Sequence, residues 1–440
     1  MLTIYRSNKA EWLAEILGQE LRLNPPEITE EVNIIVSTWP SSRWLSEKLS
    51  IINNINALVK YPFPGTYLKR LVKRIIGIDP DEKDPWEKNQ LVWNILELLP
   101  ELMKEEEAQV IRSWLEISDK KDTQINLNLW DLANNIAETF DDYILYRPEI
   151  IKQWLSKKTK KKSREISVNK NILWQEILFN LLYKKINKDP FCIQVEKAIK
   201  RLKKDDISKL DYPKNLYVYG LSSLAPLQID LIQAFSKVIN IKIYIISPCN
   251  DLWQRCEARR LQFRNTWNTP PDRQWLLESP RLEAFLGRMG AEYQQLLEGS
   301  GEYQLGDRNE EDIFSLTADI ATNKGNKPNL LEQLQQELLS TKSESILTKE
   351  KSDKSLLFLK SPGKYRQVEL IRDHILQLFS NDKEIQPRDI LIMTPQVDSY
   401  APIITSVFNN IDKNTTQLPW VITDKSQEDK VGLIHFVLNL

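Results

Sequence analysis

The sequence predicts an α/β fold with a parallel sheet and a large all-helical insertion. Runs of β-branched residues followed by amphipathic helices occur near the N-terminus and again after residue 215, a pattern typical of parallel sheets. Between about residues 61 and 204, apolar residues recur only at helical spacing. The 440 residues suffice for two or three domains.

The first strands and helices are predicted within residues 2–50. Leu2–Tyr5 is a strand, and a helix with apolar residues at Trp12, Leu13, Ile16, Leu17 and Leu21 follows it. After Pro25-Pro26, a second strand covers Val32–Val36, and a sharp turn at Trp39-Pro40 leads into another helix.

A strand, turn and helix at this position is where a nucleotide-binding protein places its phosphate loop. That loop needs glycines, a lysine and a Ser or Thr that binds magnesium. The turn here is Thr38-Trp39-Pro40-Ser41-Ser42-Arg43, with no glycine or lysine and with a proline that lacks an N–H group. The scaffold looks like that of an NTPase, but the residues for ATP chemistry are missing.

The insertion is predicted to contain successive helices with one apolar face each. Their apolar residues lie within 68–76, 91–99, 129–144, 174–186 and 194–202, with a stop at Tyr146-Arg147-Pro148. Lys69, Arg70, Lys73 and Arg74 are predicted to form a basic stripe, which would suit phosphates or be simply a solvated helix face. Tryptophans at helical apolar positions are interpreted as core residues: Trp44, Trp93, Trp114 and Trp174.

Strands return at Leu216–Tyr219 and Ile241–Ile246, joined by a helix, which predicts a parallel βαβ unit. The first of these strands ends in Tyr219-Gly220-Leu221-Ser222, without the acidic pair that a motor enzyme would use to hold magnesium.

A second βαβ unit is predicted after a mixed segment that contains one helix at Leu330–Leu339. Its strands are Leu356–Leu359 and Ile390–Met393, and the helix between them follows Ser361-Pro362-Gly363. The apolar run at the end of the sequence, GLIHFVLNL, leads us to expect an N-terminal portion of a longer protein.

Composition narrows the function classes. Three scattered cysteines and two isolated histidines argue against a disulfide framework, a thiolate or histidine metal centre, and a catalytic triad. With no signal pattern or membrane-length apolar run, the chain fits the cytoplasm.

The formal net charge is −1, but residues 150–214 hold 18 Lys and Arg against 7 Asp and Glu, which favours an acidic partner such as nucleic acid. A solvated lysine-rich linker is an equally good interpretation of Lys157–Arg164.

Motifs along the whole chain resemble the RecC family, the gamma subunits of exodeoxyribonuclease V. In order they are MLTIYRSN, VSTWPSSRWL, YPFPGTYL, FDDYILYRP, YVYGLSSLAP, the strand end ISPC, and SPGKYRQVELIRDHIL followed by PRDILIMTPQVDSYAPII and LPWVITD. The resemblance implies a superfamily 1 helicase-like fold, with RecA-like sheets whose motifs are degenerate. The implied domains are 1–60 with 205–300 (1A), 61–204 (the helical insertion, 1B), a polar connector at 301–354, and the incomplete start of 2A at 355–440.

The resemblance also implies a function. RecC-like chains are non-catalytic, DNA-binding scaffold subunits that guide the 3′ single strand of a broken duplex and recognise the Chi signal. RecB-like and RecD-like partners supply the ATP- and magnesium-dependent motors and the nuclease, so no cofactor is expected in this chain, and double-strand ends and single-stranded DNA are its expected ligands. Matching motif positions imply six DNA-binding residues: Arg43, Phe63, Lys69, Glu138, Asp141 and Arg147. Trp39-Pro40 and Lys69 depart from the usual family residues.

Structural roles compete with each of these assignments. Arginine can read guanine and carboxylates can read cytosine, yet Asp141 and Arg147 could equally form ordinary ion pairs. Phe63 could stack on an unpaired base or pack as core. Two other functions stay open: an active superfamily 1 helicase, which the missing lysine and carboxylates disfavour, and a helical protein–protein adaptor without a role on DNA.

Overall fold

The computed structural model describes residues 1–27, 30–115, 127–156, 173–204, 212–249, 288–298, 308–315, 327–339, 347–409 and 418–423. Contacts divide the chain into two units, Met1–Lys349 and Glu350–Leu440. Two predicted features lie outside the described residues: the basic run Lys157–Arg164 and the final apolar run. In the described part, no helix is long and apolar enough to cross a bilayer.

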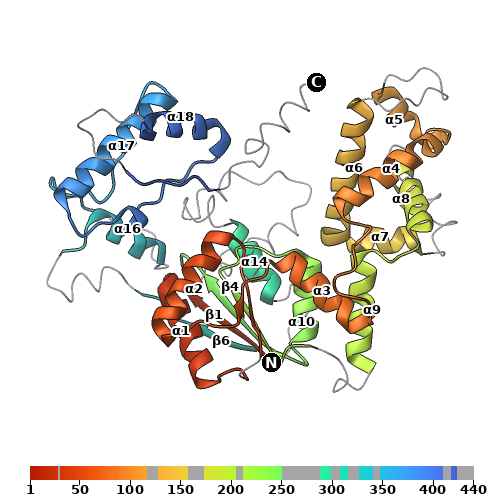
Figure 1. Cartoon of the computed structure of the whole chain (residues 1–440), viewed down its shortest axis with the longest axis horizontal. Helices are drawn as coiled ribbons and strands as arrows, with labels where there is room; N and C mark the ends of the chain where they lie inside the picture. Colours follow the sequence, from red (N-terminus) through yellow and green to blue (C-terminus); the bar gives the residue numbers. More distant parts are fainter. Residues whose placement is uncertain are drawn as a thin grey trace. The chain divides into compact units, whose positions relative to one another are not determined.

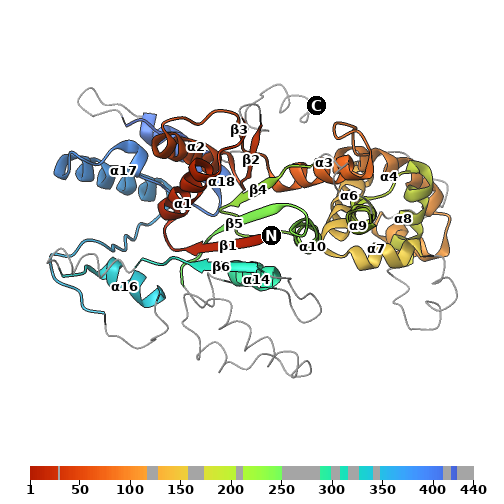
Figure 2. The same ribbon diagram turned by 90° about the horizontal axis from the view of Figure 1, so that it is seen from below.

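The described strands of the first unit form one six-stranded sheet in the order β3-β2-β4-β5-β1-β6, and every pair is parallel. Figure 2 shows these strands side by side. The strands are β1 Leu2–Ser7, β2 Val32–Ile35, β3 Val59–Lys60, β4 Asn215–Tyr219, β5 Asn240–Ile246 and β6 Arg308–Asp312. The predicted α/β class with a parallel sheet is confirmed.

Alternating residues of the strands supply two separate cores. Helices α1 (Ala10–Leu23) and α2 (Trp39–Asn53) cover one face, on which Ile34, Tyr219 and Tyr244 are buried. The other face, which includes Ile35, packs against α10 (Pro226–Phe235) and α14 (Arg288–Glu298). Since successive residues of a strand point to opposite faces, the inner strands β2, β4 and β5 carry apolar residues on both sides, as a covered parallel sheet requires.

The predicted βαβ unit is confirmed, because β4 and β5 are parallel neighbours joined by α10. The edge strand β6 was not predicted. Its sequence, RNEED, has no apolar pattern, and it pairs with β1 where the buried Arg6 guanidinium contacts Glu310 at 3.1 Å and Asp312 at 3.2 Å. The arginine thus supplies the charge that lets an acidic segment complete the sheet.

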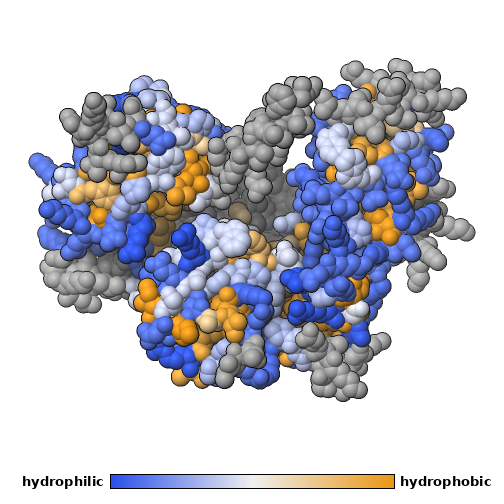
Figure 3. Space-filling model, viewed as in Figure 1, coloured by the Kyte–Doolittle hydropathy of each residue, from blue (hydrophilic) through white to orange (hydrophobic). Residues whose placement is uncertain are grey.

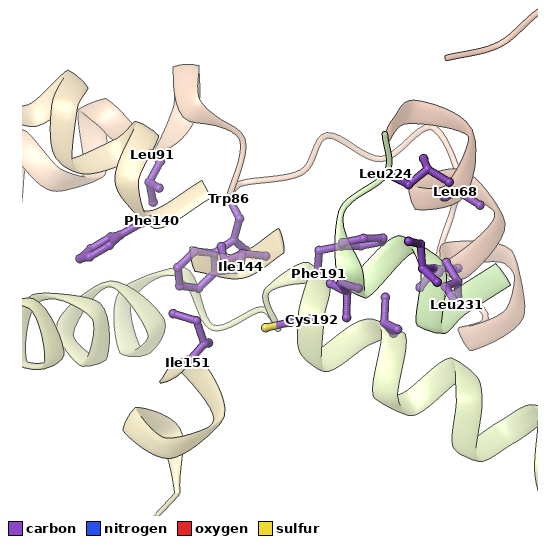
Figure 4. Packing of buried hydrophobic residues seen from close by; sticks show 14 of the residues in the cluster. Leu68, Trp86, Leu91, Phe140, Ile144, Ile151, Phe191, Cys192, Leu224 and Leu231 are labelled. Atoms are coloured by element: carbon purple, nitrogen blue, oxygen red, sulfur yellow. The ribbon is translucent and has the colours of Figure 1, made fainter. Parts of the chain in front are cut away.

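The helical region confirms the predicted run of helices between the two halves of the sheet (Figure 1). One continuous core joins it to the sheet, and Figure 4 shows Phe191 of α9 near Leu231 of α10 and Trp86 near Ile144 of α6. The helices are α3 Pro64–Ile76, α4 Lys88–Leu102, α5 Gln109–Trp114, α6 Leu127–Tyr146, α7 Pro148–Leu155, α8 Leu173–Ile186 and α9 Phe191–Lys204, with a 3-10 turn, η1, at Glu106–Ala108.

Two tryptophans expected in this core are instead exposed. Trp93 on α4 is 62% exposed and Trp114 on α5 is 57% exposed, whereas Trp44 and Trp174 are partly buried against the cores. The described part of the helical region seen in Figure 3 is mostly hydrophilic, with small hydrophobic areas. Helical spacing alone does not say which face of a helix finds a partner.

The predicted strands of the second βαβ unit are wrong. Leu356–Leu359 and Ile390–Met393 form no strand, and Phe358, Leu391 and Met393 are more than 80% exposed. Apolar extended segments become strands only when another strand pairs with them, and the described residues of this unit contain none. Its small core lies between α17 (Lys364–Asn381) and α18 (Val397–Asn409), with a 3-10 turn, η5, at Pro387–Asp389, while the predicted helix α16 (Leu330–Leu339) belongs to the first unit.

Candidate nucleic-acid interface

The strand order places a topological switch point between β2 and β4. The chain leaves β2 toward β3 on one side and leaves β4 toward β5 on the other. In open α/β sheets, ligands bind beyond the carboxyl ends of the strands at such a point. The segments that follow these two strands, Ser37–Trp39 and Gly220–Ser222, therefore mark the first candidate site.

The N-terminus of α2 at this point does not form a phosphate cradle. Thr38 caps the helix, and its hydroxyl accepts a hydrogen bond from the Ser41 N–H at 3.3 Å. The Ser42 N–H donates to the Thr38 carbonyl at 3.1 Å, and Pro40 has no N–H to offer. Trp39 and Pro40, predicted as a sharp turn, instead form the first residues of the helix. In the described part of the chain, no cluster of His, Cys, Asp or Glu could hold a metal ion.

An aromatic pair occupies the edge of the sheet instead. The Trp39 side chain is 73% exposed, and its ring meets the ring of Phe63 edge-on, with centroids 5.8 Å apart and planes at 88°. Phe63 follows β3 and precedes the first residue of α3. Sequence reasoning selected Phe63 but missed Trp39, although a tryptophan directly after a cap residue, in the first turn of a helix, was a signal that its ring would face outward.

Arg43 lies one helical turn after Trp39 on α2. It is exposed, and no hydrogen bond or ion pair of its guanidinium is found among the described residues. Residues four apart share a helix face, so Trp39 and Arg43 present a ring and a cation in the same direction. The structure thus brings together two of the six predicted residues, Arg43 and Phe63, around Trp39.

Lys69 does not lie on a solvated stripe. Its ammonium is 3.4 Å from the carboxylate of Asp84, which is 5% exposed, and 6.0 Å from the centre of the Phe191 ring. Lys73, one turn later, is buried and donates to the carbonyl of Glu82. The predicted basic stripe is therefore wrong for these two lysines: Asp84 is buried and needs a counter-charge, and α3 turns this face inward. Arg70 and Arg74 remain exposed.

The predicted carboxylates lie on α6. Glu138 accepts a hydrogen bond from Lys88 at 2.9 Å and is largely exposed. Asp141, one turn later, is half-buried; burial raises the pKa of its carboxyl, the charge of Lys69 lowers it, and the nearby carboxylates Asp142, Asp84 and Glu87 raise it. Lys69 and Asp141 thus act on each other across the junction of α3 and α6.

Arg147 lies between α6 and α7 and is exposed. Its backbone N–H closes α6 by donating to the Tyr143 carbonyl at 3.0 Å, and its own carbonyl accepts from Ile150 at the start of α7. Pro148 fixes the break between the two helices, as predicted from the sequence. The six predicted residues therefore fall into two groups, with Arg43 and Phe63 at the edge of the sheet and Lys69, Glu138, Asp141 and Arg147 along α3 and α6.

Comparison with known proteins decides the family. A family model described as RecC, N-terminal domain, matches residues 2–341. The chain belongs to the RecC family. Among its relatives, the RecBCD enzyme subunit RecC of Haemophilus influenzae is 24% identical over the whole of this chain, and that of Escherichia coli is also 24% identical over the whole chain. The RecBCD enzyme subunit RecC of Mycobacterium tuberculosis is 26% identical over 92% of the chain.

The chain spans only part of these RecC proteins. It covers 42% of the H. influenzae subunit, 41% of the E. coli subunit and 36% of the M. tuberculosis subunit. The match with the family model contains the whole described sheet and all of the helical region, and hence both groups of candidate residues.

Proposed function

We propose that this chain is a non-catalytic, DNA-binding scaffold subunit of a helicase–nuclease of the exodeoxyribonuclease V type, acting in the recombinational repair of double-strand breaks. It receives a duplex end, guides the 3′ single strand and reads the Chi signal. RecB-like and RecD-like partner subunits supply the ATP- and magnesium-dependent motors and the nuclease.

The observation that carries this proposal is the pair of the exposed Trp39 and the partly buried Phe63, with Arg43 one helical turn after Trp39, at the switch point of the sheet. An aromatic ring offers a base a stacking surface that is worth about 1–3 kcal/mol, and a neighbouring arginine offers a charge to the phosphates. The Trp39 side chain is 73% exposed and contributes little to the core, so most of its ring surface is open to a ligand.

The second group of residues suits base recognition further along α3 and α6. Arg147 can donate two hydrogen bonds to guanine, and the exposed Glu138 can accept one from the amino group of cytosine. Asp141 is half-buried, and the charge of Lys69 acts on its carboxyl group. A strand stacked on Trp39 and Phe63 would follow α3 toward these residues, since α3 begins directly after Phe63 and carries Lys69 in its second turn.

We further propose a superfamily 1 helicase-like ancestry in which the nucleotide site has been lost. The capped N-terminus of α2 offers no N–H cradle, and the segment after β4, Gly220-Leu221-Ser222, holds no carboxylate for magnesium. In this assignment residues 1–60 and 205–300 are domain 1A, residues 61–204 are domain 1B, and residues 355–440 begin domain 2A.

The test is a binding titration of the purified chain with a fluorescent oligothymidylate, repeated over a range of salt concentrations and alongside a fluorescent ATP analogue. We expect single-strand binding that weakens steeply as salt rises, with no binding or hydrolysis of ATP. Trp39→Ala should weaken DNA binding, whereas Trp12→Ala, which removes a partly exposed tryptophan of α1, should not. Hydrolysis of ATP by the chain alone, or no oligonucleotide binding at low salt, would refute the proposal.

A further inference from the structure

A second exposed aromatic pair lies in the helical region, on the outer side of α4 and α6. The Trp93 ring is 5.1 Å from the ring of Trp130, with the planes at 62°. Trp130 packs partly against the core, whereas Trp93 is 62% exposed. Helices α4 and α6 pack directly on each other, so the pair is held by two rigid elements and not by a loop. Its geometry is therefore formed before any ligand binds.

Exposed carboxylates lie on the same two helices as this pair. Glu97 and Glu101 follow Trp93 at intervals of four residues along α4, and Asp131 is the residue after Trp130, about 100° further round α6. We call these five residues the tryptophan–carboxylate face. The chain beyond α4 continues with Glu105, Glu106 and Glu107, which extends the negative charge.

The nearby cations of the described residues only partly offset this charge. Lys185 pairs with Glu97, and the exposed Lys104 lies one turn after Glu101, ahead of Glu105, Glu106 and Glu107. Glu101 and Asp131 have no ion pair within the part of the chain that the structure describes, and no described lysine or arginine lies over the Trp93 or Trp130 ring. The face therefore combines free ring surface with unneutralised carboxylates.

The charge excludes two classes of ligand. Phosphates of nucleic acids and anionic lipid headgroups would be repelled by Glu101 and Asp131, and both classes need basic residues at the contact. A protein surface with arginine or lysine would meet complementary charge, and its cations could also lie over the tryptophan rings. Tryptophan is enriched among the few interface residues that carry most of the binding energy.

We propose that the tryptophan–carboxylate face is a docking site for a basic, arginine-bearing surface of another subunit of the assembly. This inference rests on the proposed function in that it takes the partner to be a subunit of the same helicase–nuclease. Trp93 supplies the central contact, and Glu101 and Asp131 form ion pairs at its rim. DNA is handled elsewhere, at Trp39 and Phe63.

The experiment is reconstitution of the full chain with the RecB-like and RecD-like subunits of the same organism, with dissociation constants measured at several salt concentrations. Trp93→Ala should weaken assembly about tenfold or more. Asp131→Lys should also weaken it, and the wild-type affinity should fall as salt rises. The matched controls are Trp12→Ala on α1 and Glu384→Lys, a reversal of another exposed carboxylate, and both should assemble like the wild type.

Oligothymidylate binding by the same variants separates this inference from the proposed function. Trp93→Ala and Asp131→Lys should bind the oligonucleotide as the wild type does, with circular dichroism spectra that show an unchanged fold. If both variants assemble with wild-type affinity, or if the wild type binds neither subunit, the docking site is refuted, while DNA binding that depends on Trp39 would still support the proposed role on DNA. If Trp93→Ala weakened assembly but Asp131→Lys did not, and if the wild-type affinity did not change with salt, the proposed charge complementarity would be refuted.

Discussion

The edge of the sheet and the junction of α3 with α6 use similar residues in opposite ways. At the edge, Trp39 and Arg43 are exposed and have no charged partner among the described residues. At the junction, Lys69 is held by the buried carboxylate of Asp84 and acts on Asp141. A cation on a helix is thus a candidate ligand contact at the edge of the sheet. At the junction of α3 with α6, a cation on a helix is a structural element. Residue type alone does not separate the two roles; burial of the partner does.

The largest expected effect is on stability, at the junction. Lys69→Met removes the ammonium but keeps an aliphatic chain against Phe191, and it leaves the 5% exposed Asp84 without its cation. Breaking a buried pair by removing one partner is expected to cost about 2–4 kcal/mol of unfolding free energy. Thermal and urea denaturation would measure the loss.

A double variant serves as the control for this change. Lys69→Met with Asp84→Asn removes both charges and should recover part of the lost stability, although Asp84 also accepts a hydrogen bond from the Trp86 N–H. If Lys69→Met were as stable as the wild type and bound single strands less well, Lys69 would belong with the exposed group, and the contrast between the two regions would disappear.

The next effect concerns binding at the edge of the sheet. Trp39→Ala should lower single-strand affinity by about 1–3 kcal/mol, roughly 5- to 150-fold, because a stacking surface is lost. Trp39→Phe should retain part of it. Fluorescence anisotropy measures the affinity, and the melting temperature should stay unchanged, since the ring is 73% exposed. A large fall in stability without a binding defect would show that Trp39 is structural.

A smaller effect is expected for Arg43→Ala. One phosphate contact fewer should reduce the slope of log affinity against log salt by about 0.7 to 1, with little change in sequence preference. Arg43→Lys should restore the slope because it restores the charge. If the slope of log affinity against log salt were unchanged in Arg43→Ala, the Arg43 guanidinium would not contact the DNA strand.

The smallest effect is a pH dependence at the junction. Burial raises the pKa of the Asp141 carboxyl, so its protonated form is favoured in the folded state, and this contribution to stability is lost as the pH rises through the folded pKa. Asp141→Asn should therefore be slightly more stable than the wild type near neutral pH, and the difference should vanish in acid. Melting temperatures over a pH series test this; a variant that is less stable at neutral pH would show that the attraction of the Lys69 charge outweighs burial.

Local patterns were enough to predict most of the first unit. Buried strand segments such as Leu216–Tyr219 are continuously apolar, and the helix stop at Pro148 depends on the missing N–H of proline. Phe63 was selected from the sequence, but its neighbour Trp39 was not, because the contact between the two rings joins α2 to the start of α3 across the edge of the sheet. Such contacts depend on the tertiary arrangement, which a pattern within one segment does not contain.

The incorrect predictions from the sequence also result from tertiary contacts. Lys69 and Lys73 looked solvated because nothing in the helix itself reveals that Asp84 and the Glu82 carbonyl, in the segment between α3 and α4, fold back onto it. The strand β6 has a sequence that disfavours strands and forms only where Arg6 meets its carboxylates. Conversely, Ile390–Met393 has a strong strand sequence and remains unpaired among the described residues.

The ion pairs between Arg6 and β6 join residues 304 and 306 positions apart in the chain. During synthesis, strand β1 therefore emerges from the ribosome long before the edge strand β6 that pairs with it. Until residues 308–312 are made, a nascent chain exposes one edge of β1 and lacks both carboxylates for Arg6. Arrested fragments that end before Arg308 should accordingly be cleaved by protease at β1 far more readily than fragments that extend past Asp312.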